Sequence, residues 1–159
     1  MPNYLFTFII VGIPETIAAV MICLALLGER WPFRRIFIVA AVVTLVAYLC
    51  RLLPVAFGVH SVMCATTLGY LLSRMSSAPT ITAFTVAAGT MVFMYISDTA
   101  SFVFFENVLG IEFQELVGNV WLWSLSGLPH VLILFLAAFI LNRFPLSRLY
   151  KKREGTGLF

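Results

Sequence analysis

The stretch YLFTFIIVGIPETIAAVMICLALL, residues 4–27, decides the class of this protein. It is an apolar run that carries Pro14 and Glu15 side by side near its middle. A helix needs about 20 apolar residues to cross the hydrocarbon core of a bilayer. We therefore expect residues 4–27 to span a membrane. We expect the span to be retained, because no basic segment precedes it and no small-residue cleavage site follows.

Composition extends this interpretation to the rest of the chain. Of the 159 residues, 62% are hydrophobic and 11% are charged, and the mean hydropathy is +1.04. Soluble domains carry roughly 25% charged residues, so most of the apolar surface must face lipid. Further apolar segments lie at about 36–53, 61–72, 81–104 and 125–144. The sequence predicts an all-α, polytopic transmembrane bundle of about five spans at residues 1–144, with a basic cytoplasmic tail at 145–159.

The basic residues set the expected orientation. With five spans and a cytoplasmic carboxy terminus, the amino terminus lies outside and nearly all of the cations lie inside, in agreement with the positive-inside rule. The expected inner cations are Arg30, Arg34, Arg35, Arg74, Arg143, Arg148, Lys151, Lys152 and Arg153. The short basic tail is expected to contact lipid headgroups rather than nucleic acid.

The long outer loop is predicted to form a short amphipathic helix between Gly110 and Gly118. Its apolar residues recur at helical spacing and its polar residues fall on the opposite face. The apolar positions are Leu109, Phe113, Leu116, Val117 and Val120. This helix would either shield the ends of the spans or act as a lid for an external ligand.

Ionisable residues inside the predicted spans are the candidate functional residues. Glu15 lies about 16 Å along its helix from residue 4, close to the middle of the bilayer. Arg51 and Asp98 share a depth nearer the outer side. A charged side chain at the helix centre costs on the order of 3 kcal/mol, so we expect an interior polar cluster with Arg51 between Asp98 and Glu15. His60 and His130, predicted at the outer ends of spans, would lie near this cluster.

Pro14 explains why Glu15 is placed where it is. A proline cannot donate to the helical ladder and frees the carbonyl four residues back. A helix that restarts at Pro14 holds Glu15 in its first turn, where the positive helix end favours a carboxylate. The sequence predicts a kink at Pro14. Two interpretations stay open: a structural ion pair that fixes helix register, or a site for a ligand, proton or ion.

Small residues spaced by four, Ala65, Gly69 and Ser73, predict a close helix contact within one chain or between chains. The three cysteines lie in apolar runs without metal-ligand spacing. We find no serine–histidine–carboxylate arrangement and no phosphate-binding loop. We therefore expect no enzymatic activity, no cofactor and no metal.

Three stretches resemble a known family: GIPETIAAVMICLALLGERWPFRRI, YLCRLLPVAFGVH and SLSGLPHVLIL. They are similar to the multi-span amino-terminal sensor region of Firmicutes histidine kinases with GHKL-type ATPase domains, over about residues 11–142. The chain shows no phosphotransfer helix and no ATPase domain, so the resemblance implies a free-standing sensor module. It would place these residues in or near the sensing core, with Asp98 added by its depth: Glu15, Arg51, Pro54, Gly58, His60 and Pro129.

Three functions compete on this basis. The first is a sensor-like or regulatory module in the bacterial cytoplasmic membrane that binds an external or membrane-embedded signal and acts through a cytoplasmic partner. The second is a structural protein that assembles into a homo-oligomer or array. The third is a small oligomeric transporter or channel subunit. Neutralisation of Glu15 should affect the first and third functions and spare the second.

Overall fold

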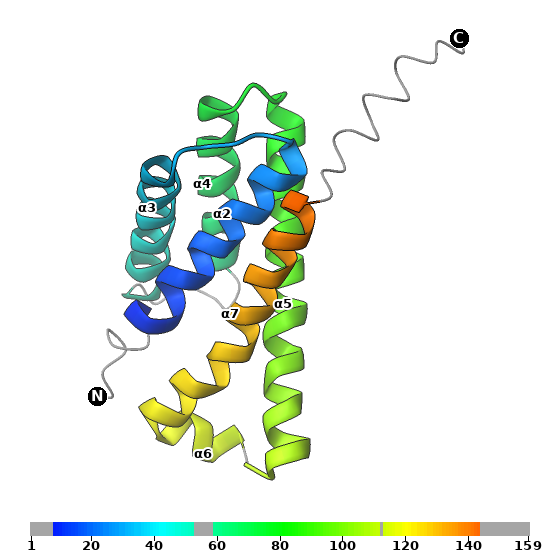
Figure 1. The fold of residues 1–159 in the computed structure, drawn as a ribbon. Coiled ribbons are helices and arrows are strands. Elements are labelled where there is room, and N and C mark those ends of the chain that lie inside the picture. Colours follow the sequence, from blue (N-terminus) through cyan, green and yellow to red (C-terminus); the bar gives the residue numbers. More distant parts are fainter. Residues whose placement is uncertain (1–7, 53–58, 112, 144–159) are drawn as a thin grey trace.

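The computed structural model describes residues 8–52, 59–111 and 113–143, so the predicted tail at 145–159 lies outside the described residues. The described residues form helices and short connections, with no strand among them (Figure 1). In chain order these are the π-helical turn η1 (Phe8–Gly12), α2 (Ile13–Leu27), α3 (Phe33–Leu52), α4 (Val59–Met75), α5 (Thr80–Leu109), α6 (Phe113–Gly118) and α7 (Val120–Arg143). The all-helical class predicted from the sequence is confirmed.

Within the described part of the chain, four helical segments are long and apolar enough to cross a membrane. They are Phe8–Leu27, Phe33–Cys50, Thr80–Leu109 and Val120–Arg143. These segments make the chain a multi-pass membrane protein. The shorter α4, of 17 residues, packs against α3 and α5 and ends beside the start of α5 (Figure 1).

The long helices alternate in direction, and α2 lies at the centre of the arrangement. It contacts α3, α5 and α7. α2 and α7 run in the same direction, toward the end of the bundle where α2 joins α3 and α4 joins α5 (Figure 1). Two adjacent parallel helices advance along the bundle in the same direction. The contact between α2 and α7 therefore places residues early in α2 beside the middle of α7.

The core has two parts, and α2 contributes to both. The larger part joins α2 to α3, α4 and α5, and includes Val20, Val39, Leu68 and Ala87. The smaller part joins α2 to α7 through Ala18, Ile22, Leu134 and Ala138. α2 therefore joins the two parts of the core.

Glycine permits the closest contact between α4 and α5. Gly69 is buried, and a Cβ atom there would lie 2.8 Å from Cδ1 and 3.2 Å from the Cα atom of Phe84. Of the small residues predicted to form a packing face, Gly69 makes this contact within the chain. Ala65 and Ser73 are half-buried on the same helix, and the Ser73 hydroxyl donates to the Tyr70 carbonyl.

The connection between α5 and α7, predicted as the outer loop, differs from its prediction in extent. A short helix is present as α6, but Leu109 is the last residue of α5 and Val120 is the first of α7, so their assignment to the loop helix was wrong. α5 ends where Gly110 adopts a φ of +66°, a conformation that glycine adopts without strain. Its 30 residues span about 45 Å, more than the roughly 30 Å of a hydrocarbon core. The carboxyl end of α5 therefore projects beyond α4 (Figure 1).

Candidate functional site

Glu15 on α2 lies beside His130 on α7. The distance from Glu15 Oε1 to His130 Nε2 is 3.4 Å. The His130 side chain is 2% exposed and that of Glu15 is 30% exposed. Each residue directly follows a proline, Pro14 or Pro129. Two helices that contain proline thus bring a carboxylate and an imidazole together inside the bundle.

The start of α2 positions the carboxylate. Pro14 is the second residue of α2, which begins directly after the π-helical turn Phe8–Gly12, and it lies in the first turn of α2 together with Glu15. Because proline supplies no N–H to the ladder, the wide turn ends there and regular α-helix follows. The structure shows this change in helical geometry beside Pro14, and a kink in the helix axis there stays a prediction. π-Helical turns are rare and occur frequently at functional sites.

The position of His130 corrects the sequence-based expectation. We expected His130 at the outer end of a span that begins near residue 125, but α7 already begins at Val120. Asn119 explains the earlier start, because its side-chain Oδ1 accepts a hydrogen bond from the Trp121 N–H at 3.0 Å, which is the role of a helix N-cap. His130 therefore lies well inside α7, and the prediction that placed it at a helix end was wrong.

A close backbone approach brings the two helices together. A Cβ atom on Gly127 would lie 2.8 Å from Val11 Cγ1, so the side chain of Val11 fills the space that glycine leaves open. Glu15 lies four residues beyond Val11, and His130 lies three residues beyond Gly127. Residues three and four apart share one face of a helix. The Glu15–His130 pair therefore lies about one helical turn beyond the contact of Val11 with Gly127.

The imidazole of His130 is not satisfied by hydrogen bonds. Among the described residues, neither Nδ1 nor Nε2 has a hydrogen-bond partner, because the 3.4 Å approach of Glu15 lacks hydrogen-bond geometry. Buried polar groups are normally hydrogen-bonded. A buried group that lacks its hydrogen bond destabilises the fold by about 1–3 kcal/mol. The fold thus holds the Glu15 carboxyl group and the His130 imidazole 3.4 Å apart without a hydrogen bond between them.

Serine hydroxyl groups donate hydrogen bonds to carbonyl groups of α7 close to Pro129. Pro129 takes a donor from the helical ladder, which frees the carbonyl of Leu125. At the next residue, the buried Ser101 hydroxyl on α5 donates to the Ser126 carbonyl at 2.6 Å. The Ser126 hydroxyl in turn donates to the Trp123 carbonyl at 2.9 Å. The hydrogen bond from Ser101 joins the segment of α7 before His130 to α5.

A second set of hydroxyls fixes the start of α2. The Thr16 hydroxyl donates to the Gly12 carbonyl at 2.7 Å, across the junction between η1 and α2. Thr44 on α3 donates to the Thr16 hydroxyl at 3.0 Å. Glu15 is thereby held between a junction anchored to α3 on one side and α7 on the other.

The remaining members of the predicted polar cluster have other surroundings. Arg51 belongs to the last turn of α3, but its side chain lies outside the described part of the structure. Asp98 is half-buried on α5 and takes part in an interaction. His60, at the start of α4, has its Nε2 3.2 Å from the Ser61 hydroxyl. The partner that the structure shows for Glu15 is His130, and the predicted contact with Arg51 stays a prediction.

Neither the histidines nor the cysteines form a metal centre in the described structure. No group of three or more His, Cys, Asp and Glu residues among residues 8–52, 59–111 and 113–143 could hold a metal ion. Cys23, Cys50 and Cys64 are buried and form no disulfide bond in the described structure. The Pro54 and Gly58 positions named by the family resemblance lie outside the described residues.

A clamp at the opposite end of α2 was not foreseen from the sequence. Glu29, in the connection between α2 and α3, accepts a hydrogen bond from the Ser77 hydroxyl at 2.7 Å and another from the Trp31 indole at 2.9 Å. The Ser77 backbone N–H also donates to it. Burial alone would raise the pKa of Glu29, but these hydrogen bonds together hold the pKa below its ordinary value of 4.5. Glu29 thus joins the α2–α3 connection to the α4–α5 connection.

Comparison of this chain with protein-family models, with curated proteins and with solved structures gives no match. The resemblance to the sensor regions of histidine kinases therefore stays a prediction. The functional argument below rests on the geometry of the Glu15–His130 pair.

Proposed function

We propose that this protein is a non-enzymatic, sensor-like membrane module in which the Glu15–His130 pair is the signal-responsive site. The observation that carries the proposal is a buried imidazole that makes no hydrogen bond to any described residue and lies 3.4 Å from a carboxylate, between two helices that contain proline. Ionisable residues within membrane spans are functional sites by default. A ligand or proton that completes or breaks this contact would favour one arrangement of α2 and α7 over another.

The fold offers a route from this site to a cytoplasmic partner. α2 is continuous from Glu15 to Leu27, and the next residues form the clamp between Glu29 and Ser77. A displacement of α2 at the pair would therefore act on two connections at once. A two-state element that a signal can bias is the minimum requirement for such coupling.

The charge distribution supports a five-span topology with the amino terminus outside. In this proposal α4 is the fifth span, and the clamp end of the bundle faces the cytoplasm. Five of the six described arginines lie at that end, namely Arg30, Arg34, Arg35, Arg74 and Arg143, whereas Arg51 lies in the last turn of α3 at the other end. The same asymmetry favours this orientation in the bacterial cytoplasmic membrane. Self-association into a homo-oligomer would provide a second means of transmitting the change.

The proposal can be tested by measuring the conformation of the clamp end. Spin labels are placed on cysteines introduced at the exposed positions Arg30 and Arg143, since the native cysteines are buried. The distance distribution between the labels is then measured by pulsed electron paramagnetic resonance in lipid nanodiscs. Glu15→Gln should shift or broaden this distribution. His130→Gln should do the same, and the double variant should add nothing further.

The matched control is Glu106→Gln, which neutralises an exposed carboxylate on α5 and leaves the pair itself intact. It should leave the distances unchanged, and circular dichroism should show that every variant keeps its helical content. Unchanged distances in folded Glu15→Gln and His130→Gln would overturn the sensor proposal and favour a static pair. A solute flux into liposomes that is lost in Glu15→Gln would instead identify a transporter.

A further inference from the structure

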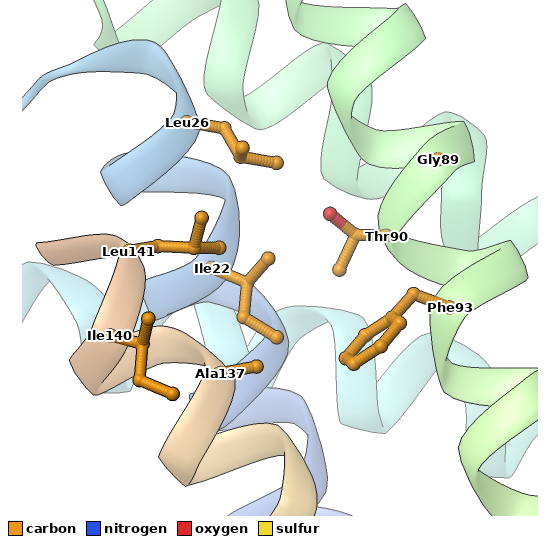
Figure 2. A pocket seen from close by; sticks show the side chains of 8 residues that line it. All are labelled: Ile22, Leu26, Gly89, Thr90, Phe93, Ala137, Ile140 and Leu141. Carbon is orange, nitrogen blue, oxygen red and sulfur yellow. The ribbon is translucent and has the colours of Figure 1, made fainter. Parts of the chain in front are cut away.

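An apolar cavity lies between α2, α5 and α7, away from the Glu15–His130 pair. Its volume is about 370 Å³, within the range of sites that bind small ligands. Figure 2 shows side chains from the three helices pointing into one space. Ile22 and Leu26 line it from α2, Phe93 from α5, and Ala137 from α7.

The cavity opens on the outer surface of the bundle rather than lying sealed inside. Gly89 on α5 and Ile140 on α7 both line it, and both are exposed. A Cβ atom on Gly89 would meet nothing within 4 Å. In a membrane this opening faces the acyl chains of the bilayer, so an apolar chain is the occupant that its walls and its surroundings both favour.

Polar and cationic groups lie at the helix ends just beyond this cavity. A second cavity, of about 30 Å³, is lined by Gly28, Arg30 and Asn142, among others. Gly28 is two residues beyond Leu26, and Asn142 follows Leu141, which also lines the larger cavity. The apolar walls therefore give way to polar groups within one helical turn on both α2 and α7.

The charge at this end complements an anionic headgroup. Arg30 is exposed, and no hydrogen bond or ion pair engages it among the described residues. Glu29 next to it is turned to Ser77 and Trp31 by hydrogen bonds. Basic residues near a membrane surface attract anionic lipids, each by a factor of about five in affinity.

We propose that the cavity between α2, α5 and α7 binds an acyl chain of an anionic phospholipid, whose headgroup phosphate contacts Arg30. The apolar walls select the chain, and the cation selects the charge of the headgroup. This site is distinct from the Glu15–His130 pair, and its existence does not depend on the sensor function.

The test is lipid retention. The protein is reconstituted in vesicles that contain equal amounts of phosphatidylglycerol and phosphatidylcholine, extracted in mild detergent, and examined by native mass spectrometry. The wild type should retain one phospholipid and should prefer phosphatidylglycerol by about fivefold. Arg30→Gln should remove most of this preference. Arg74→Gln, which changes an exposed cation on α4 away from the cavity, should keep it.

Filling the cavity separates chain binding from headgroup attraction. Gly89→Leu should abolish retention of both lipids, whereas Ala88→Leu, at the neighbouring exposed position that does not line the cavity, should not. Ala137→Leu fills the same space from α7 and provides a second variant should Gly89→Leu fail to fold. Absence of retained lipid in the wild type, equal retention in the Gly89 and Ala88 variants, or retention without headgroup preference would each overturn the proposal.

Discussion

Gly127 lies so close to Val11 that a Cβ atom on the glycine would stand 2.8 Å from Cγ1 of the valine. This contact between η1 and α7 sets the separation of two parallel helices. One turn further along, the same separation leaves Glu15 and His130 3.4 Å apart. The geometry of the candidate site is therefore a consequence of one residue that lacks a side chain.

Gly127→Ala should destabilise the protein by about 1–3 kcal/mol, the usual cost of overpacking. The β-branched Val11 has little freedom to move aside, so α7 must shift away from η1. Unfolding in mixed detergent micelles measures the effect. Val11→Ala should restore much of the loss. Gly89→Ala is the control, because its Cβ meets nothing within 4 Å, and it should be neutral or stabilising. Equal effects at Gly127 and Gly89 would contradict the close contact.

The Glu15–His130 pair should cost stability rather than supply it. Replacing both residues with leucine removes a buried imidazole and the partly exposed carboxylate beside it, and such a replacement of a buried pair is often neutral or stabilising by about 1–4 kcal/mol. His130→Leu alone should be less stable than the double variant, because it leaves the carboxylate without its partner. Free energies of unfolding from the two single variants and the double variant measure this coupling. A double variant that is the least stable of the three would show that the pair is a structural anchor.

The Glu29 clamp should make stability depend on pH. The pKa of Glu29 is lower in the folded protein than its ordinary value of 4.5, so the carboxylate stabilises the fold above pH 4.5. This contribution, about 1 kcal/mol or less for a partly exposed group, should disappear as the pH falls through the folded pKa. The measurement is the difference in thermal midpoint between wild type and Glu29→Gln at neutral and at acidic pH. Glu106→Gln, an exposed carboxylate on α5, is the control and should show no comparable loss.

Gly69→Ala should separate α4 from α5. The new Cβ would lie 2.8 Å from Phe84 Cδ1 and 3.2 Å from the Phe84 Cα atom. Truncation of the ring by Phe84→Ala relieves the first clash but not the second, so rescue should be partial. Thermal stability in detergent gives the order wild type, double variant, Gly69→Ala. Full rescue by Phe84→Ala would show that the backbones are further apart than in the structure.

The membrane class and most helix bounds follow from the sequence alone. A run of about 20 apolar residues ended by proline, glycine or arginine can satisfy its backbone in lipid only as a helix. The predicted segments at 36–53 and 61–72 correspond to α3 and α4, with ends that differ by a few residues. The break at Pro14 could also be predicted, since the missing N–H of proline is a local property.

The tertiary structure alone decided which polar residues meet. Glu15 and His130 are far apart in the chain, and depth along separate helices suggested only a wider cluster that also included Arg51 and Asp98. The start of α7 depends on the Asn119 cap, and this shift moved His130 from the expected helix end into the interior. The shared proline before Glu15 and before His130 was the signal in the sequence that could have joined them. Composition and periodicity fix each helix in lipid, because backbone hydrogen bonds there are local. Which polar side chains of different helices meet depends instead on how closely the helices approach each other. At this site the contact of Gly127 with Val11 sets the distance between the helices.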